Sequence, residues 1–275
     1  HVYRWCRRRR IPFVAYVGTA HSLDSNFKSK VMNALFAAGT LRIYKKNPVL
    51  AKTSAAKEEL RQLGVPHAVI APVGLDTAVL KKNIPADEKM RLRKEHGFEA
   101  DDVILCNVSR LSWEKRPLEL IDLFLQVKGK KKFKLIIVGN GPLEEELNEK
   151  IRKNGLEKEV KIYPNVPYEK MWEIYEMSDY YLNMNKGEIF GMAIMEAVYY
   201  KTSVAAIRAL GPSVTLKDMK GHKLCENDDE MAEWITGPYP SEKDLQESSE
   251  KMAATFTWDR CADAFLQASS EKSSR

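Results

Sequence analysis

Two glutamates stand eight residues apart in the segment Glu188-Ile-Phe-Gly-Met-Ala-Ile-Met-Glu196. An apolar run precedes the first and a helical pattern follows it, which places Glu188 in a turn and Glu196 about one and a half turns into a helix. A carboxylate accepts hydrogen bonds from two neighbouring hydroxyls, as a sugar offers them, while Gly191 and the N–H groups that open a helix suit a phosphate. The pair indicates a ligand with hydroxyls and phosphate. The open alternative is a loop glutamate and a solvated helix glutamate, because this spacing is common by chance.

Two cations follow an earlier apolar run, in the segment Asn107-Val-Ser-Arg-Leu-Ser-Trp-Glu-Lys-Arg-Pro117. Arg110 falls in the turn after the run, and Lys115 is expected to open the next helix. Arginine binds phosphate as a bidentate fork and lysine as a point charge, so together they can neutralise a diphosphate leaving group. For Lys115 the alternative is a solvated helix start, shared with Glu114 and Arg116.

A third turn, Val138-Gly-Asn-Gly-Pro142, also follows an apolar run, and Pro142 fits the first position of a helix. A dinucleotide-binding fingerprint needs a further glycine near residue 144, where Glu144 stands. The segment therefore indicates a tight turn between a strand and a helix, and it argues against an NAD-dependent oxidoreductase, which stays a lower alternative.

Metal chemistry has little support. The sequence contains no Asp-x-Asp motif; Asp101-Asp102 precede an expected strand and Asp228-Asp229 fall in a polar segment interpreted as a loop, so no metal site is expected. The cysteines lack the spacing of a zinc or redox site and are interpreted as reduced buried thiols, with the cytoplasm as the default compartment: Cys6, Cys106, Cys225 and Cys261.

The elements that position these residues are short apolar runs, each followed by a helical pattern. The runs are rich in Val, Ile and Leu on both faces, which is typical of a parallel sheet covered by helices. We expect strands at Ile11–Gly18, Val69–Pro72, Val103–Ser109, Phe133–Gly139, Val160–Tyr163, Tyr180–Met184 and Ser203–Ile207. We expect helices at Lys28–Ala38, Ser54–Leu63, Pro117–Val127, Pro142–Lys153, Tyr168–Met177, Met192–Tyr200 and Glu230–Ile235, and two more within Ser241–Phe265.

This alternation predicts an α/β fold with a doubly wound, Rossmann-like parallel sheet in the C-terminal part and a partial α/β domain before it. In such a sheet ligands bind at the carboxyl ends of the strands, where the turns with Arg110 and Glu188 fall. The composition, 44% hydrophobic and 30% charged over 275 residues, is that of an ordinary globular protein. The net charge of +6 favours anionic partners without choosing among phosphate ligands, nucleic acid and lipid head groups.

In order and spacing, the three motifs resemble those of the retaining glycosyltransferases of family 4, which have two facing Rossmann-like domains of the GT-B type. The resemblance covers essentially the whole chain and is specific to the family, not to one substrate. It extends over further segments: Phe13–His21, Lys52–Leu60, Pro72–Asp76 and Phe256–Trp258. The sequence departs from the family pattern at positions that bear on donor identity more than on fold: Ser109, Asn165, Tyr200-Lys201, Ser203 and Leu210.

The resemblance implies a role for each candidate residue. Arg110 and Lys115 would hold the donor diphosphate, and His21 would lie near the anomeric carbon. Glu188 would hold hydroxyls of the donor sugar, and Glu196 would hold the ribose. The remaining donor-binding candidates are the backbone of Ile189, Phe190 and Gly191, Val166 near the base, and Gly141.

The implied activity is transfer of a sugar from a nucleoside-diphosphate sugar to a hydroxyl of a glycan, a lipid-linked or a small-molecule acceptor, with retention of configuration. No metal or other cofactor is expected, because the two cations and a helix dipole take the place of a metal ion. The basic run Arg7–Arg10 is more often a solvated helix end than a binding site, and nucleic acid is not expected as a partner. Reversible contact with the anionic inner face of a membrane stays open.

The resemblance also divides the chain. Residues 1–80 correspond to part of the acceptor-side domain, 81–101 to the interdomain linker, 102–250 to the nucleotide-sugar-binding domain and 251–275 to a helix that crosses back to the N-terminal domain. The family's first strand and Gly-rich loop are not visible before His1. A fragment is therefore expected, and a fragment that binds nucleotide sugar without catalysis is the main alternative to an active enzyme.

Overall fold

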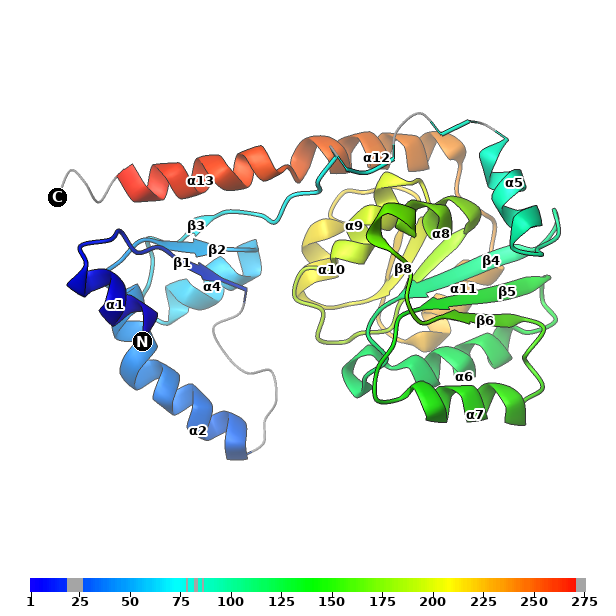
Figure 1. Cartoon of the computed structure of the whole chain (residues 1–275), viewed down its shortest axis with the longest axis horizontal. Helices are drawn as coiled ribbons and strands as arrows, with labels where there is room; N and C mark the ends of the chain where they lie inside the picture. The colour runs from blue at the N-terminus through cyan, green and yellow to red at the C-terminus, as the bar shows by residue number, and fades with distance from the viewer. Residues whose placement is uncertain (19–26, 78, 82–83, 86, 271–275) are drawn as a thin grey trace. The chain divides into compact units, whose positions relative to one another are not determined.

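Two compact units make up the chain in the computed structural model, which describes residues 1–18, 27–77, 79–81, 84–85 and 87–270 (Figure 1). The smaller unit is His1–Leu75 with Phe256–Arg275, and the larger unit is Asp76–Thr255. The predicted site residue His21 lies outside the described residues. No helix in the described part of the chain combines the length and the apolar character needed to cross a membrane.

A parallel sheet of six strands forms the centre of the larger unit, in the spatial order β6-β5-β4-β7-β8-β9. This is the order 3-2-1-4-5-6 of dinucleotide-binding folds, in which the winding reverses between the first and fourth strands. Here those strands are β4 and β7, which pair at Leu105 and Tyr180. The predicted doubly wound α/β fold is therefore confirmed. The strands are β4 (Val103–Val108), β5 (Phe133–Val138), β6 (Val160–Tyr163), β7 (Tyr180–Asn183), β8 (Ser203–Ile207) and β9 (Lys223–Cys225).

Helices cover both faces of this sheet (Figure 1). On one face α6 (Pro117–Val127) packs against α7 (Glu144–Lys153) and α11 (Asp228–Thr236), and their buried Leu, Ile, Met and Phe side chains join those of the strands in one core. The other face carries α8 (Met171–Met177) and α9 (Met192–Tyr199), with α12 (Glu242–Thr255) against α9.

Helix α5 (Glu88–Glu95) lies within residues 81–101, the predicted linker, and packs against α8. It is anchored by Arg93, which is 5% exposed and donates to a carboxylate oxygen of Asp179 at 2.6 Å and to the Met177 carbonyl at 2.9 Å. Asp179 stands immediately before β7 and also accepts from the Ile104 N–H of β4. This buried ion pair joins α5 to the two central strands.

The smaller unit holds a second parallel sheet, in the order β1-β2-β3. A buried cluster that includes Val17, Leu41, Val49 and Leu60 fills one side of it. Helix α13 (Trp258–Ser270) packs on β2 and β3. The other elements of the smaller unit are α1 (Val2–Arg8), β1 (Ala15–Val17), α2 (Phe27–Leu35), the π-helical turn Phe36–Thr40, α3 (Leu41–Tyr44), β2 (Val49–Ala51), α4 (Ser54–Gln62) and β3 (Val69–Ile70).

Several predicted boundaries were wrong. Strand β1 covers only three of the residues expected at Ile11–Gly18, and β2 and β9 were missed because three-residue strands beside lysines carry little apolar pattern. The predicted loop at Asp228-Asp229 is instead the first turn of α11, where the side chain of Asn227 accepts from the Glu230 N–H and caps the helix.

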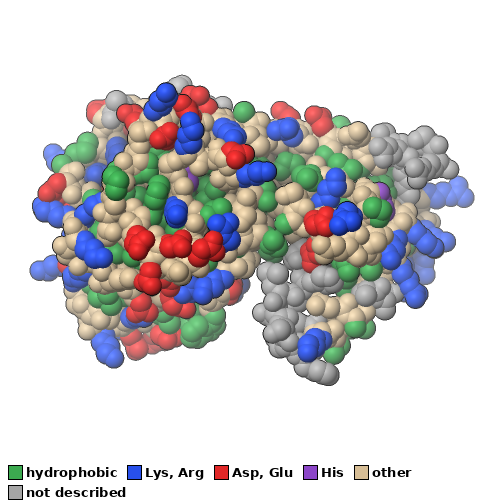
Figure 2. Space-filling model, turned by 180° about the vertical axis from the view of Figure 1, so that it is seen from behind, with side chains coloured by type: hydrophobic (Ala, Val, Ile, Leu, Met, Phe, Trp, Pro, Cys, Tyr) green, Lys and Arg blue, Asp and Glu red, His purple; other side chains and the backbone are tan. Residues whose placement is uncertain are grey.

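Charges of both signs are interspersed over the face of the larger unit that Figure 2 shows, with acidic side chains gathered into one short band. The net charge of +6 is therefore not concentrated on that face. Charge alone does not indicate a single anionic partner there.

We expect the larger unit to lose stability in mild acid because of His222. Its Nδ1 accepts from the Val204 N–H at 3.0 Å, and burial lowers the pKa of the ring to about 4. The unfolded chain then binds a proton first as the pH falls, so stability that is present above pH 6.5 is lost toward pH 4, by roughly 1–3 kcal/mol. Urea denaturation at several pH values should show this slope. It should be flattened by His222→Asn and unchanged by His67→Gln, which replaces an exposed histidine; a slope that persists in His222→Asn would contradict the assignment.

Candidate functional site

An ion pair joins the turns that follow β4 and β7. Lys115 Nζ lies 2.8 Å from Glu188 Oε2, and both side chains are largely buried, at 26% and 15% exposed. Lys115 ends the short 3₁₀ turn Trp113–Lys115, two residues before α6, and so does not open that helix as predicted. The pair stands at the carboxyl edge of the sheet where its winding reverses, which is the position at which open α/β sheets bind ligands.

Glu188 is held from several directions. Asn185 Nδ2 donates to the same oxygen at 3.1 Å, and the Phe190 N–H donates to the carboxylate as well. Burial by itself raises the pKa of Glu188, but the hydrogen bond and charge of Lys115, with the bonds from Asn185 and Phe190, outweigh it and lower the pKa. Glu188 is therefore an oriented anion at neutral pH, suited to accept hydrogen bonds from hydroxyls.

The turn from Glu188 to Gly191 leads into α9. Gly191 has a φ of +87°, a conformation that favours glycine, and it occupies the N-cap position of the helix. The Gly211 N–H donates to the Glu188 carbonyl at 2.8 Å and holds the turn from the outside. Because the Phe190 ring is buried, this segment offers a ligand mainly its backbone and the half-buried Ile189.

The glycine turn after β5 packs against the turn that carries Arg110. A Cβ on Gly141 would stand 2.4 Å from the Leu111 carbonyl oxygen. The Leu111 N–H donates to the Asn140 carbonyl at 2.9 Å, and the Leu143 N–H donates to the Leu111 carbonyl at 3.1 Å. Gly141 thus supports the Arg110 turn by close backbone packing, and Arg110 itself is exposed. Pro142 was expected to begin the helix, but α7 begins at Glu144.

Replacing Gly141 with alanine is expected to destabilise the chain by about 1–3 kcal/mol, because the added methyl group forces the Leu111 turn away. The shift should also weaken any ligand that Arg110 binds. Urea denaturation measures the first effect and calorimetric titration the second. Gly39→Ala is the matched control, since its Cβ would meet nothing within 4 Å. Equal stability of the two variants would contradict the packing argument.

Glu196 lies in α9 and is 8% exposed. The Tyr175 hydroxyl donates to Glu196 Oε2 at 2.7 Å, and the Tyr168 side chain lies close to the same carboxylate. Burial raises the pKa of Glu196, and the two tyrosines oppose the rise only in part. Neither Tyr175 nor Tyr168 was foreseen from the sequence, because tyrosines at helical spacing are ordinary core residues.

The structure does not bring every candidate together. Val166 follows the edge strand β6 and is half-buried, in a loop linked to the β5 turn through Asn140 Nδ2, which donates to Asn165 Oδ1 at 2.9 Å. Among the described residues, no hydrogen bond or ion pair joins Val166 to Lys115 or Glu188. Its role near a base stays a prediction.

The sequence did not reveal that Arg116 supports the site, because it indicated a solvated helix start there. It has a φ of +55°, just before Pro117, and its guanidinium donates to both carboxylate oxygens of Asp228, at 3.1 and 2.8 Å. It also donates to the Met184 carbonyl, in the segment between β7 and Glu188. Arg116 therefore holds the backbone on both sides of the ion pair.

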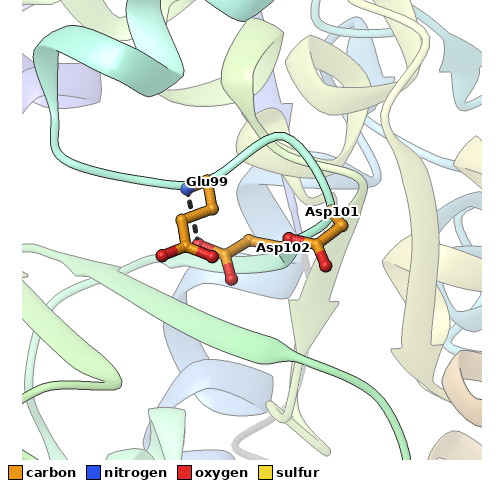
Figure 3. A group of neighbouring side chains, drawn as sticks. All are labelled: Glu99, Asp101 and Asp102. Atoms are coloured by element: carbon orange, nitrogen blue, oxygen red, sulfur yellow. Dashed lines mark hydrogen bonds between the residues drawn. The ribbon is translucent and has the colours of Figure 1, made fainter.

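At the opposite edge of the sheet, the carboxylates of Glu99, Asp101 and Asp102 gather before β4 (Figure 3). Lys132 lies 2.6 Å from Asp101 and 3.5 Å from Glu99, and Asp102 accepts from the Glu99 N–H. These partners offset the charge that would attract a cation. The exposed Glu99 and Asp101 thus form ion pairs with Lys132, and the buried Asp102 accepts a backbone hydrogen bond.

Comparison with known proteins gives a family. Residues 88–252 match the sequence profile of "Glycosyl transferases group 1". The D-inositol 3-phosphate glycosyltransferase of Mycobacterium avium (strain 104) is 26% identical over 297 aligned residues, which cover 95% of this chain and 65% of that relative. The alpha-monoglucosyldiacylglycerol synthase of Streptococcus pneumoniae (strain ATCC BAA-255 / R6) is 24% identical over 139 residues, 50% of this chain and 32% of that enzyme.

A solved structure shares the fold. HepE of Anabaena, in complex with UDP and glucose, superimposes with a TM-score of 0.77 at 19% identity, over 98% of this chain and 73% of that one. The likeness confirms the GT-B type of fold expected from the sequence. In the sequence comparison, this chain spans about two thirds of the length of the curated relative from M. avium.

Proposed function

Because the chain belongs to the family of group 1 glycosyl transferases, we propose that it transfers a sugar from a nucleoside-diphosphate sugar to an acceptor hydroxyl with retention of the anomeric configuration, as in family 4. The observation that supports this most is the Lys115–Glu188 ion pair at the carboxyl edge of β4 and β7. It combines a cation for phosphate with an anion for sugar hydroxyls at the position where this fold binds nucleotides.

In the proposed reaction the bond between the anomeric carbon and the diphosphate oxygen breaks, and the acceptor oxygen bonds to the same face. The acceptor proton passes to an oxygen of the leaving phosphate. Lys115 and the exposed Arg110 stabilise the negative charge that develops on that phosphate, and Glu188 fixes hydroxyls of the donor sugar. We assign no step to a metal ion, because these cations and the N-terminus of α9 supply the positive charge.

Glu196 is assigned to the ribose, and the backbone of Ile189, Phe190 and Gly191 to the phosphate or the sugar. Gly141 acts through the Arg110 turn that it supports. The larger unit is therefore the donor-binding part of the proposed enzyme. The main alternative is a chain that binds nucleotide sugar without turnover.

Acceptors of three kinds fit the proposal: glycans, lipid-linked molecules and small hydroxyl compounds. Peripheral contact with an anionic membrane is favoured by helix α1, where Val2 is 67% and Trp5 52% exposed beside the basic run Arg7–Arg10. The pneumococcal relative is by name a diacylglycerol glycolipid synthase. The four cysteines are buried and free, which suits the cytoplasm as the proposed compartment.

Titration with UDP, ADP, GDP and their glucose conjugates, with NADH as the negative control, tests the proposal. At least one nucleoside diphosphate should bind, and Lys115→Met should lower its affinity about tenfold or more, because the charged contact to phosphate is lost. Lys132→Met, at the opposite sheet edge, should leave it unchanged. Absence of binding by every nucleotide would overturn the proposal, and binding without product formation would favour the inactive alternative.

A further inference from the structure

The surroundings of Glu196 divide into a fixed side and a movable side. On the fixed side Tyr175 is 1% exposed and stacks on Tyr200, with ring centroids 5.9 Å apart and planes inclined by 11°. The Thr202 hydroxyl donates to the Tyr175 carbonyl at 2.9 Å, and the Lys81 N–H donates to the Tyr200 hydroxyl at 2.9 Å. Tyr175 therefore cannot turn away from Glu196 without unpacking the core.

On the movable side Tyr168 is 48% exposed. It begins the three-residue 3₁₀ turn Tyr168–Lys170, directly after Pro167, and its side chain lies close to the Glu196 carboxylate. An exposed side chain on a short surface turn can change rotamer on the nanosecond scale. Tyr168 can thus leave Glu196 at little cost to the packing.

A buried carboxylate needs hydrogen-bond donors, because an unsatisfied charged group in a protein interior is costly. The Tyr175 hydroxyl supplies one donor from the core, and the Tyr168 side chain lies close to the carboxylate on the accessible side. A ribose offers two neighbouring hydroxyls, which can replace Tyr168 on the accessible side but not the buried donor.

On the assumption that Glu196 binds the ribose, as in the proposed function, we propose that the two tyrosines make this site selective for ribonucleotides. Tyr175 is a positioning residue that fixes one oxygen of Glu196 from the core. Tyr168 holds the place of a ribose hydroxyl and gives way when the nucleotide binds. The two tyrosine hydroxyls then have opposite effects: that of Tyr175 supports ribose binding, and that of Tyr168 competes with it.

The test compares each ribonucleoside diphosphate that binds, among UDP, ADP and GDP, with its 2′,3′-dideoxy analogue by calorimetry on the full chain. The wild-type chain should prefer the ribose form by about tenfold or more, as expected for a charged hydrogen bond. Tyr175→Phe should lower the ratio of the ribonucleotide affinity to the dideoxynucleotide affinity severalfold. Tyr168→Phe should raise this ratio, because it increases the affinity for the ribonucleotide alone. Because the ratio is taken within one variant, a general loss of stability does not move it.

Tyr180→Phe is the matched control: the Tyr180 hydroxyl is buried and has no partner in the described part of the chain. Its ratio should equal that of the wild type, and Glu196→Gln should narrow the ratio like Tyr175→Phe. An unchanged ratio in Tyr175→Phe, or a narrowed one in Tyr168→Phe, overturns the inference while the proposed function stands. If the wild-type chain binds none of the three nucleotides, the proposed function itself fails.

Discussion

Replacing Glu188 with glutamine is expected to lower kcat by roughly 10- to 100-fold, the loss of one charged hydrogen bond worth about 1.5–3 kcal/mol in the transition state. The glutamine keeps the size of the side chain but leaves Lys115 without its anion, and it accepts hydroxyl hydrogen bonds less strongly. The affinity for free nucleoside diphosphate should change much less, because that ligand has no donor sugar. Rates of product formation give the effect on kcat, and calorimetry gives the effect on nucleotide affinity. Both are measured on a form of the enzyme that turns over.

Glu196→Gln provides the comparison. It should weaken the binding of free nucleoside diphosphate and of donor alike, because the ribose is present in both. An equal loss of free-nucleotide affinity in the two variants would contradict the division of roles. If neither variant changed rate or affinity, both glutamates would be ordinary structural residues, and the proposed function would lose its best support.

Asp179→Ala is expected to destabilise the larger unit by about 3–5 kcal/mol, as is usual when one partner of a buried ion pair is removed. The change leaves the Arg93 guanidinium without its carboxylate, and it removes the acceptor of the Ile104 N–H and an ion pair with Lys89 at 2.9 Å. Urea denaturation followed by far-UV circular dichroism measures the loss.

The control is Asp101→Ala, which removes an exposed ion pair with Lys132 and should cost less than about 1 kcal/mol. Arg93→Met together with Asp179→Leu should recover part of the loss, because two apolar side chains leave no unpaired charge. Similar stabilities for Asp179→Ala and Asp101→Ala would show that the Arg93 anchor contributes little.

The sequence predicted the central elements of the larger unit well, and the reason is physical. Strands such as Phe133–Val138 and Ser203–Ile207 are mostly apolar because they are buried between two layers of helices, so pattern and structure coincide. Strand β2, Val49–Ala51, is as fully buried, but three apolar residues between Pro48 and Lys52 form no recognisable pattern. Short strands become evident only through their neighbours in the sheet.

The candidate site was predictable to the extent that it depends on strand ends. Lys115 and Glu188 follow β4 and β7, and the topology brings them together. The contacts of Arg116 with Asp228 and of Tyr175 with Glu196 were not predictable, because they join elements 112 and 21 residues apart through side-chain directions that no local pattern specifies. The supporting residues around a site were thus the part that sequence reasoning missed.

The strand order also has a consequence for how the molecule assembles. Strands β4, β5 and β6 are neighbours both in sequence and in space, so this half of the sheet can form through short connections. Strand β7 must return past both of them to pair with β4, and the Lys115–Glu188 contact spans 73 residues. Contacts of such separation form late, because the chain entropy of closing the loop opposes them. Competence to bind a nucleotide should therefore appear in the last kinetic phase of refolding, after most helical signal has returned.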